Sequence, residues 1–173
     1  SGSSGAQCVA CHMPSTTYMQ VQPRPDHSLR IPRPDLSVKL GTPNACSSCH
    51  ADRTAQWAAD NVERWYGAGR AKGPHFGEAF AAARAGQPSA SAAVVRVVNE
   101  PGVPPIVRST ALSLLRADPD AGVTERMQAT RDADPEVRAA AADSLQAVPA
   151  GPRAYALVPL LADPVRAVRI AAA

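Results

Sequence analysis

The sequence predicts a mainly α-helical protein, in which an irregular N-terminal region is followed by a short α-solenoid. Three observations lead to this prediction. Proline is closely spaced between residues 14 and 43, Ala dominates after residue 78, and a Val-Arg pair recurs about every 30 residues in the second half. Proline lacks a backbone donor and disfavours helix at the residue before it, so the first region should be irregular. The expected domains are residues 1–72 and residues 73–173.

The charge and the apolar content of the chain limit the classes of partner that it is expected to bind. The 173 residues carry a formal net charge of +3, and Lys39 and Lys72 are the only lysines. The arginines are scattered, without a basic run or an interleaved aromatic stripe, which argues against nucleic acid as a partner. No apolar stretch approaches the roughly 20 residues that a membrane-spanning helix needs. The opening SGSSG is either an artificial leader or a linker within a longer protein. The final residues fall within a repeat, so the sequence is expected to be part of a longer protein, truncated at its C-terminus.

Two Cys-x-x-Cys-His motifs occupy residues 8–12 and 46–50 and contain all four cysteines of the chain. Haem c attachment needs two thiols at this spacing, one for each porphyrin vinyl group, and a following His as axial iron ligand. Only four His occur in the chain, and two of them directly follow the Cys pairs. The motifs therefore predict two covalent haem c groups, bound by Cys8, Cys11, Cys46 and Cys49 and ligated by His12 and His50.

The N-terminal region has few apolar residues with which to form a core of its own. Its larger apolar side chains between residues 18 and 40 are Tyr18, Met19, Val21, Leu29, Ile31, Leu36, Val38 and Leu40. The Pro-rich segments 21–27 and 31–35 should be extended or turning. Two bound macrocycles would supply the missing apolar mass, so the region is expected to be packed around haem.

Two other uses of Cys-x-x-Cys pairs compete with haem. A four-thiolate zinc site is one, but its pairs are usually about 15 to 20 residues apart, whereas 34 residues separate Cys11 from Cys46. Zinc also has no need for the two adjacent His. A redox disulfide of the thioredoxin kind is the other, and it requires a strand context that the sequence lacks.

The remaining histidines, His27 and His75, match the two axial positions that His12 and His50 leave open. If both bind, each iron is bis-His, low-spin and closed to substrate, which suits electron transfer. Ordinary surface histidines, or ligands of a haem elsewhere in a longer protein, are the alternatives.

Helices are predicted from residue 52 onward. Trp57, Asn61 and Trp65 lie four residues apart, and the first helix should end near Gly67. Pro74 is suited to the first turn of a helix that runs to residue 85. Further helices are expected over residues 90–100, 105–117, 121–131, 135–147, 152–162 and from 164 onward.

The Val-Arg pairs begin at residues 107, 137 and 168, and each is followed by Ala four residues after the Val. A period of about 30 with two helices per unit is typical of a solenoid, because one helix pair cannot bury its own apolar face. The pattern resembles short, Ala-rich HEAT repeats. A nonspecific helical bundle is the simpler alternative.

The residues 8–14, Asp26-His27 and residues 46–50 together resemble multihaem c-type cytochromes, especially those with a helical-repeat tail. They are similar in part to a stretch of the pentahaem nitrite reductases. The resemblance covers roughly residues 7–80. It implies a periplasmic or otherwise extracytoplasmic location, closely packed bis-His haems, and further haem domains upstream in the parent protein. It also implies that His75 binds opposite His12, which leaves His27 for another haem, such as that of His50.

The function expected from the sequence is electron transfer through two haems, with the helical repeats docking redox partner proteins. The catalytic haem of the nitrite reductases, with Lys as proximal ligand, has no counterpart here, so nitrite reduction by this chain is not expected. A haem enzyme that reduces a small nitrogen, sulfur or oxygen species at an open iron is one alternative. A protein-interaction scaffold with a structural zinc site is the other.

Overall fold

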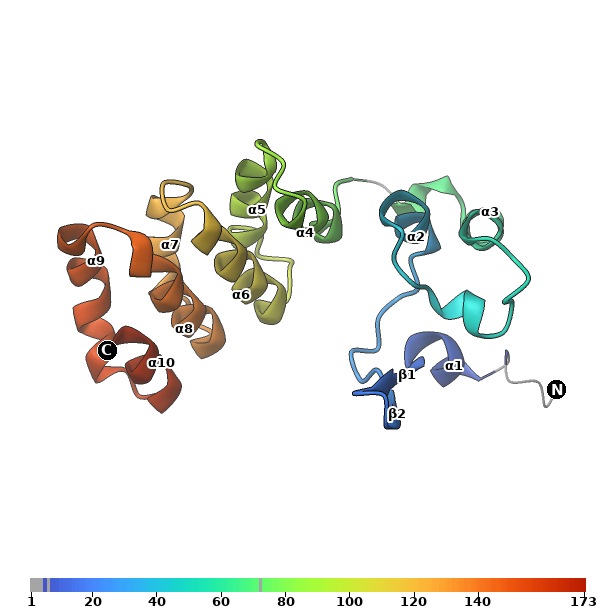
Figure 1. Ribbon diagram of the computed structural model, residues 1–173, viewed down its shortest axis with the longest axis horizontal. Coiled ribbons are helices and arrows are strands. Elements are labelled where there is room, and N and C mark those ends of the chain that lie inside the picture. Colours follow the sequence, from blue (N-terminus) through green and yellow to red (C-terminus); the bar gives the residue numbers. More distant parts are fainter. Residues whose placement is uncertain (1–4, 6, 72) are drawn as a thin grey trace. The chain divides into compact units, whose positions relative to one another are not determined.

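The computed structural model describes residues 5, 7–71 and 73–173 and confirms a mainly helical chain (Figure 1). The chain forms two compact units, Ser1–Pro74 and His75–Ala173. The boundary expected from the sequence was between residues 72 and 73.

The N-terminal unit combines short helices with a small hairpin. Its elements are α1 (Cys8–His12), β1 (Ser15–Tyr18), β2 (Gln22–Pro25), α2 (Pro34–Leu40), η2 (Ala45–Ser48), α3 (Ala55–Tyr66) and η3 (Ala68–Ala71). The two strands pair antiparallel, with Ser15 opposite Pro25 and Tyr18 opposite Gln22. Thr54 caps α3 by accepting a hydrogen bond from the backbone N–H of Trp57 at 3.1 Å.

The Pro-rich segment 31–35 was predicted to be extended or turning, and this is wrong for its last two residues, which begin helix α2. Pro34 stands at the first position of α2, where its missing N–H removes no helical hydrogen bond, and Asp35 follows in the first turn. Gly41 ends the helix in the left-handed conformation, with φ 68°. Helix α2 packs against α3, and Leu36 and Ala58 are buried there.

The C-terminal unit is entirely helical in the part of the chain described. Its elements are α4 (Phe76–Arg84), α5 (Ala90–Val98), α6 (Pro105–Leu114), η4 (Leu115–Ala117), α7 (Val123–Ala129), α8 (Pro135–Ser144), η5 (Leu145–Ala147), α9 (Ala150–Leu157), η6 (Val158–Ala162) and α10 (Arg166–Ala172). Helix α5 packs against α4 and α6, and α8 lies between α6 and α10 (Figure 1). The predicted helices agree with these positions to within two residues at their starts, and α6, α8 and α9 continue into a 3₁₀ turn.

The core of this unit consists of small and branched side chains from successive helices. Its largest cluster includes Phe80, Val94, Val107, Leu112, Leu115 and Val137. A buried arginine, Arg126 of α7, lies among these helices with no exposed surface.

Gly122, immediately before α7, should not tolerate a side chain. Its φ is +60°, and an added Cβ would lie 2.5 Å from Val95 Cγ2. We expect Gly122→Ala to lower the free energy of unfolding by about 2 kcal/mol, because backbone strain and steric overlap act together. Urea unfolding followed by circular dichroism measures this.

The matched control is Gly151→Ala within α9. An added Cβ there meets nothing within 4 Å. This variant should be neutral or stabilising by up to about 1 kcal/mol, since Ala is the better helix former. Equal effects of the two substitutions would contradict the assignment of strain to Gly122.

Candidate haem-attachment site

The first half of the N-terminal unit has almost no core of its own. None of residues 7–33 is buried, and several large apolar side chains there are more than half exposed: Val9, Tyr18, Met19, Val21, Leu29 and Ile31. A large apolar cofactor would bury surface that the polypeptide leaves in contact with water, so this part of the chain fits the haem predicted from its motifs.

The first motif forms α1. Cys8 and Cys11 are both exposed and are three residues apart, so they lie on the same face of the helix. His12, in the last turn, has its Nδ1 atom 3.0 Å from the backbone carbonyl oxygen of Arg30. A carbonyl can only accept, so Nδ1 carries the proton of the neutral ring and Nε2 has the free lone pair. Axial iron ligation through Nε2 requires this tautomer.

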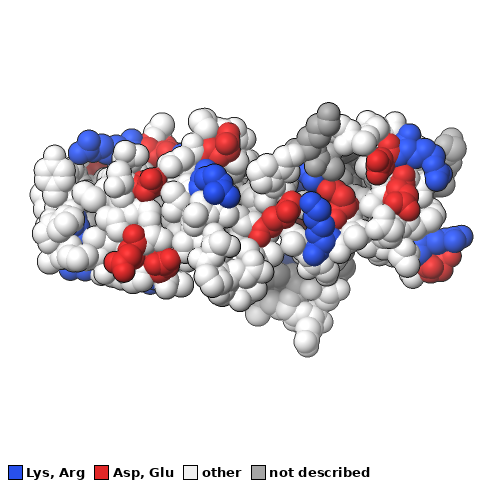
Figure 2. Space-filling model, turned by 90° about the horizontal axis from the view of Figure 1, so that it is seen from above, with Lys and Arg blue, Asp and Glu red and all other residues white. Residues whose placement is uncertain are grey.

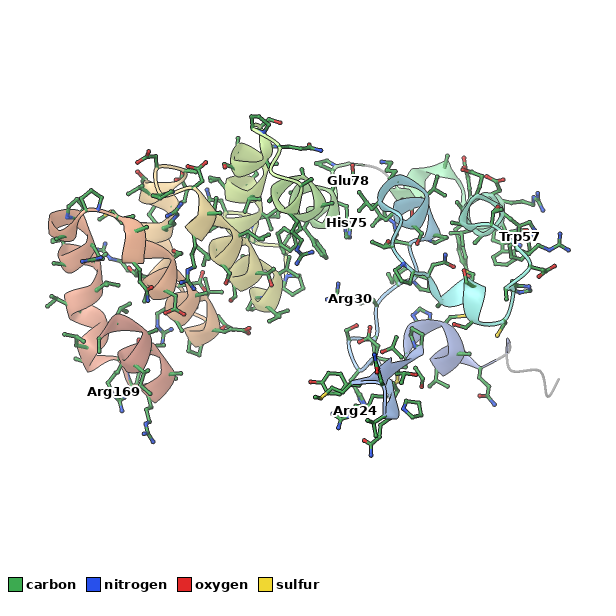
Figure 3. All side chains as sticks on the ribbon, in the orientation of Figure 1. Arg24, Arg30, Trp57, His75, Glu78 and Arg169 are labelled. Atoms are coloured by element: carbon green, nitrogen blue, oxygen red, sulfur yellow. The ribbon has the colours of Figure 1, made fainter. Side chains whose placement is uncertain are left out.

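The second motif is presented by the 3₁₀ turn η2. Asn44 caps this turn, and its Oδ1 accepts from the backbone N–H groups of Cys46 at 3.0 Å and Ser47 at 3.2 Å. The His50 ring lies against the Trp57 ring, with their centroids 4.8 Å apart and their planes at 51°. Trp57 belongs to α3 (Figure 3). The second His is therefore restrained by an aromatic contact.

The two motifs lie next to each other, because α1 packs against η2. Burial, together with the nearby Cys11 thiol, raises the pKa of the Cys46 thiol. Beside the motifs is an open depression of about 530 Å³, lined by residues of both, including Val9, Ala10, Ser48 and Cys49. This volume lies within the usual range for ligand sites.

The thiols do not converge with other ligands on one point. Among residues 5, 7–71 and 73–173, no three or more His, Cys, Asp or Glu side chains are placed so that they could hold a metal ion. A four-thiolate zinc site needs such convergence, and the geometry offers it no support. Thioether attachment needs none, because the sulfurs bond to the porphyrin edge and not to iron.

The arginines between the two motifs have local partners. Arg24 lies over the Tyr18 ring at 4.9 Å, and Arg33 forms a bidentate ion pair with Asp35. Figure 3 shows Arg24 and Arg30 within the N-terminal unit. On the face of the described residues that Figure 2 shows, basic and acidic side chains are interspersed and neither sign covers a continuous area.

The two further candidate iron ligands, His27 and His75, lie in different structural environments. His27 is exposed in the turn after β2. His75 belongs to the C-terminal unit and is the N-cap of α4, where its Nδ1 accepts from the Gly77 N–H at 3.0 Å. The predicted helix start at Pro74 is therefore wrong by two residues, because the His75 side chain occupies the cap. Capping places the proton of a neutral ring on Nε2, so this arrangement and Nε2 ligation of iron exclude one another.

The two roles of His75 can be separated by substitution. We expect His75→Ala to lower the free energy of unfolding of the C-terminal unit by about 1 kcal/mol, and His75→Asn to preserve it, since Asn is among the best N-cap residues. Hydrogen exchange of α4 measures this effect.

Asn is not an axial iron ligand, so a haem spectrum that turns high-spin in His75→Asn would report ligation alone. An unchanged spectrum in both variants would remove His75 from the ligand set.

Two contributors to the site were not identified from the sequence. The Arg30 carbonyl is a backbone group, so no residue type marks it. Asn44 carries a recognisable signal, because Asn directly before a helical turn is a preferred cap.

No described helix has the length and apolar character needed to cross a membrane. Comparisons with protein-family models, with curated proteins and with solved structures find no match to this chain.

Proposed function

We propose that the N-terminal unit carries two covalent haem c groups, on Cys8/Cys11 and Cys46/Cys49, and that it transfers electrons outside the cytoplasm. His12 and His50 are the proximal ligands in this proposal. The observation that carries it is the hydrogen bond from His12 Nδ1 to the Arg30 carbonyl. Metal-binding histidines almost always donate from their other ring nitrogen in this way, which fixes the tautomer and the ring orientation.

The thiol positions and the exposed apolar surface agree with this assignment. Cys8 and Cys11 are accessible on one helical face, as attachment requires, and Cys49 is exposed in the second motif. Bound haem would supply one-electron redox chemistry. The polypeptide binds the porphyrin edge, orients the two imidazoles and excludes water through its apolar residues. Export precedes haem c attachment in general, so an extracytoplasmic location follows.

The sixth ligand decides between a carrier and an enzyme. His27 and His75 would close both irons and restrict the protein to electron transfer. The capping role of His75 favours a second candidate function, in which one iron keeps an open position and reduces a small nitrogen, sulfur or oxygen species. A high-spin signal that shifts on adding cyanide would support this enzyme over the carrier.

For the C-terminal unit we propose HEAT-like repeats that dock a redox partner protein. The support is a hydrogen-bond pattern that recurs with the sequence period. Arg108 forms a bidentate pair with Asp132, and Arg138 forms one with Asp163. Both Asp side chains also accept from the backbone N–H two residues later, in Asp134 and Val165.

A second set of contacts repeats in the same register. Arg138 donates to the carbonyls of residues 132 and 133, and Arg169 donates to those of residues 163 and 164. Each of these arginines thus donates to the carbonyls six and five residues before it, and the two sets of contacts are 31 residues apart in the sequence. Figure 3 shows Arg169 on the last helix. Stacked repeats of this kind present an extended surface, which suits protein docking.

Expression of the full chain with a signal peptide and a working haem c maturation system tests the proposal. Intact mass should increase by two haem groups, and the pyridine haemochrome spectrum should show thioether-linked haem. No added mass and no visible absorbance would exclude the proposal. Zinc without iron in metal analysis would favour the interaction scaffold.

A further inference from the structure

The turn after the hairpin holds the carbonyl that accepts from His12. The backbone N–H of Asp26 donates to the Pro14 carbonyl at 3.1 Å, which ties the start of this turn to the end of the first motif. Asp26 Oδ1 accepts from the Ser28 N–H at 2.9 Å, and Ser28 Oγ accepts from Arg30 Nε at 3.2 Å. The turn of residues 26–30 is therefore held at both ends by hydrogen bonds.

Leu29 adopts a rare backbone conformation within this turn. Its φ is 49°, in the left-handed region that favours Gly and Asn. Such a conformation persists only where neighbouring contacts determine it, and it often occurs at functional sites. Here it directly precedes Arg30, the residue whose carbonyl accepts from His12.

Hydrogen bonds from the Ser28 side chain and backbone lower the pKa of the exposed Asp26 carboxyl from its ordinary value.

We propose that Asp26 is a positioning residue for His12. Through the turn of residues 26–30 it holds the Arg30 carbonyl against Nδ1, and so keeps Nε2 ready as the iron-binding nitrogen before haem is attached. The role of this arrangement in haem binding rests on the function proposed above. The hydrogen bonds themselves involve only groups of the polypeptide, so they can be tested without haem. An imidazole that donates to a carbonyl is also a more basic ligand, and this favours ferric iron.

Imidazole ¹⁵N chemical shifts of the full-length apo protein test the tautomer directly. We expect His12 to be protonated at Nδ1 in the wild type and to become a mixture of tautomers in Asp26→Ala. Asp26→Asn should retain the wild-type tautomer, because its Oδ1 can still accept from Ser28. Asp52→Ala, which removes an exposed carboxylate two residues after His50, is the control and should leave His12 unchanged. A His12 protonated at Nε2 in the wild type would overturn the inference.

Potentiometry of the haem-loaded protein provides a second readout. Asp26→Ala should raise the potential of one haem, and a tenfold loss of preference for ferric iron corresponds to about 59 mV. Asp26→Asn removes the same charge but keeps the acceptor, so its potential should stay closer to that of the wild type. Equal shifts in both variants would show a simple charge effect and would overturn the positioning role.

The inference and the proposed function can fail separately. Wild-type protein that takes up no haem but shows His12 protonated at Nδ1 would exclude the function and retain the turn as a tautomer-fixing element. Protein that binds two haems but has His12 protonated at Nε2 in its apo form would support the function and exclude the tautomer-fixing role of the turn.

Discussion

Replacing Cys46 and Cys49 by Ala is expected to remove one of two haems from the matured protein. The mass should fall by one haem group, and the visible absorbance should fall by about half. Because the N-terminal unit buries few residues of its own, hydrogen exchange over residues 7–50 should accelerate strongly. Helices beyond residue 90 have a separate core and should keep their protection.

Two further variants control this experiment. Ser47→Ala with Ser48→Ala changes the same motif but retains both thiols and His50, so both haems should remain. Cys8→Ala with Cys11→Ala should remove the other haem. Uniform loss of protection along the whole chain in the Cys46/Cys49 variant would contradict the division into two independently stabilised units.

Replacing Arg126 is expected to have the largest effect on the C-terminal unit. Its guanidinium donates to the carbonyls of Ser144, Leu115 and Asp118, at the ends of helical segments. The Leu115 and Asp118 carbonyls also accept from the backbone N–H groups of Asp118 and Ala121. Arg126→Ala would remove the guanidinium hydrogen bonds to all three carbonyls and open a cavity. We expect a loss of about 3 to 5 kcal/mol in the free energy of unfolding.

Arg126→Lys should recover only part of this loss, because one ammonium group lacks the planar fork that reaches separate carbonyls. Burial lowers the pKa of the Arg126 guanidinium, but its charge persists at neutral pH. Arg131→Ala removes an exposed arginine five residues away and should change stability by less than about 0.5 kcal/mol. Urea unfolding measures all three variants, and similar midpoints for Arg126→Ala and Arg131→Ala would disprove the role of the buried guanidinium.

The period of the second half allowed its helices to be predicted closely. Apolar positions three and four residues apart, and Pro, Ser or Asp near helix starts, are local signals, so α5, α6 and α8 begin where they were expected. Helix α2 was missed, because the same prolines that break a helix can also begin one. Which role a proline takes depends on burial of Leu36 against α3, a contact distant in sequence.

The two motifs predict which thiols and histidines would bind haem, since haem attachment depends on residue types at fixed short spacing. The groups that hydrogen-bond to these motifs could not be predicted in the same way. The haem ligands themselves remain a prediction. The cap at His75 was not expected, because His is an uncommon N-cap and Pro74 offered a stronger signal for the helix start.

The sequence by itself determined the helical class and the two Cys-x-x-Cys-His motifs, because both depend on residues close together in the chain. Tertiary structure decided which nitrogen of His12 is protonated, through a carbonyl 18 residues away. It also decided that Arg126 is buried, through three carbonyls that come together only when the helices stack. Backbone acceptors are identical in every residue, so only the folded chain shows which of them a side chain meets.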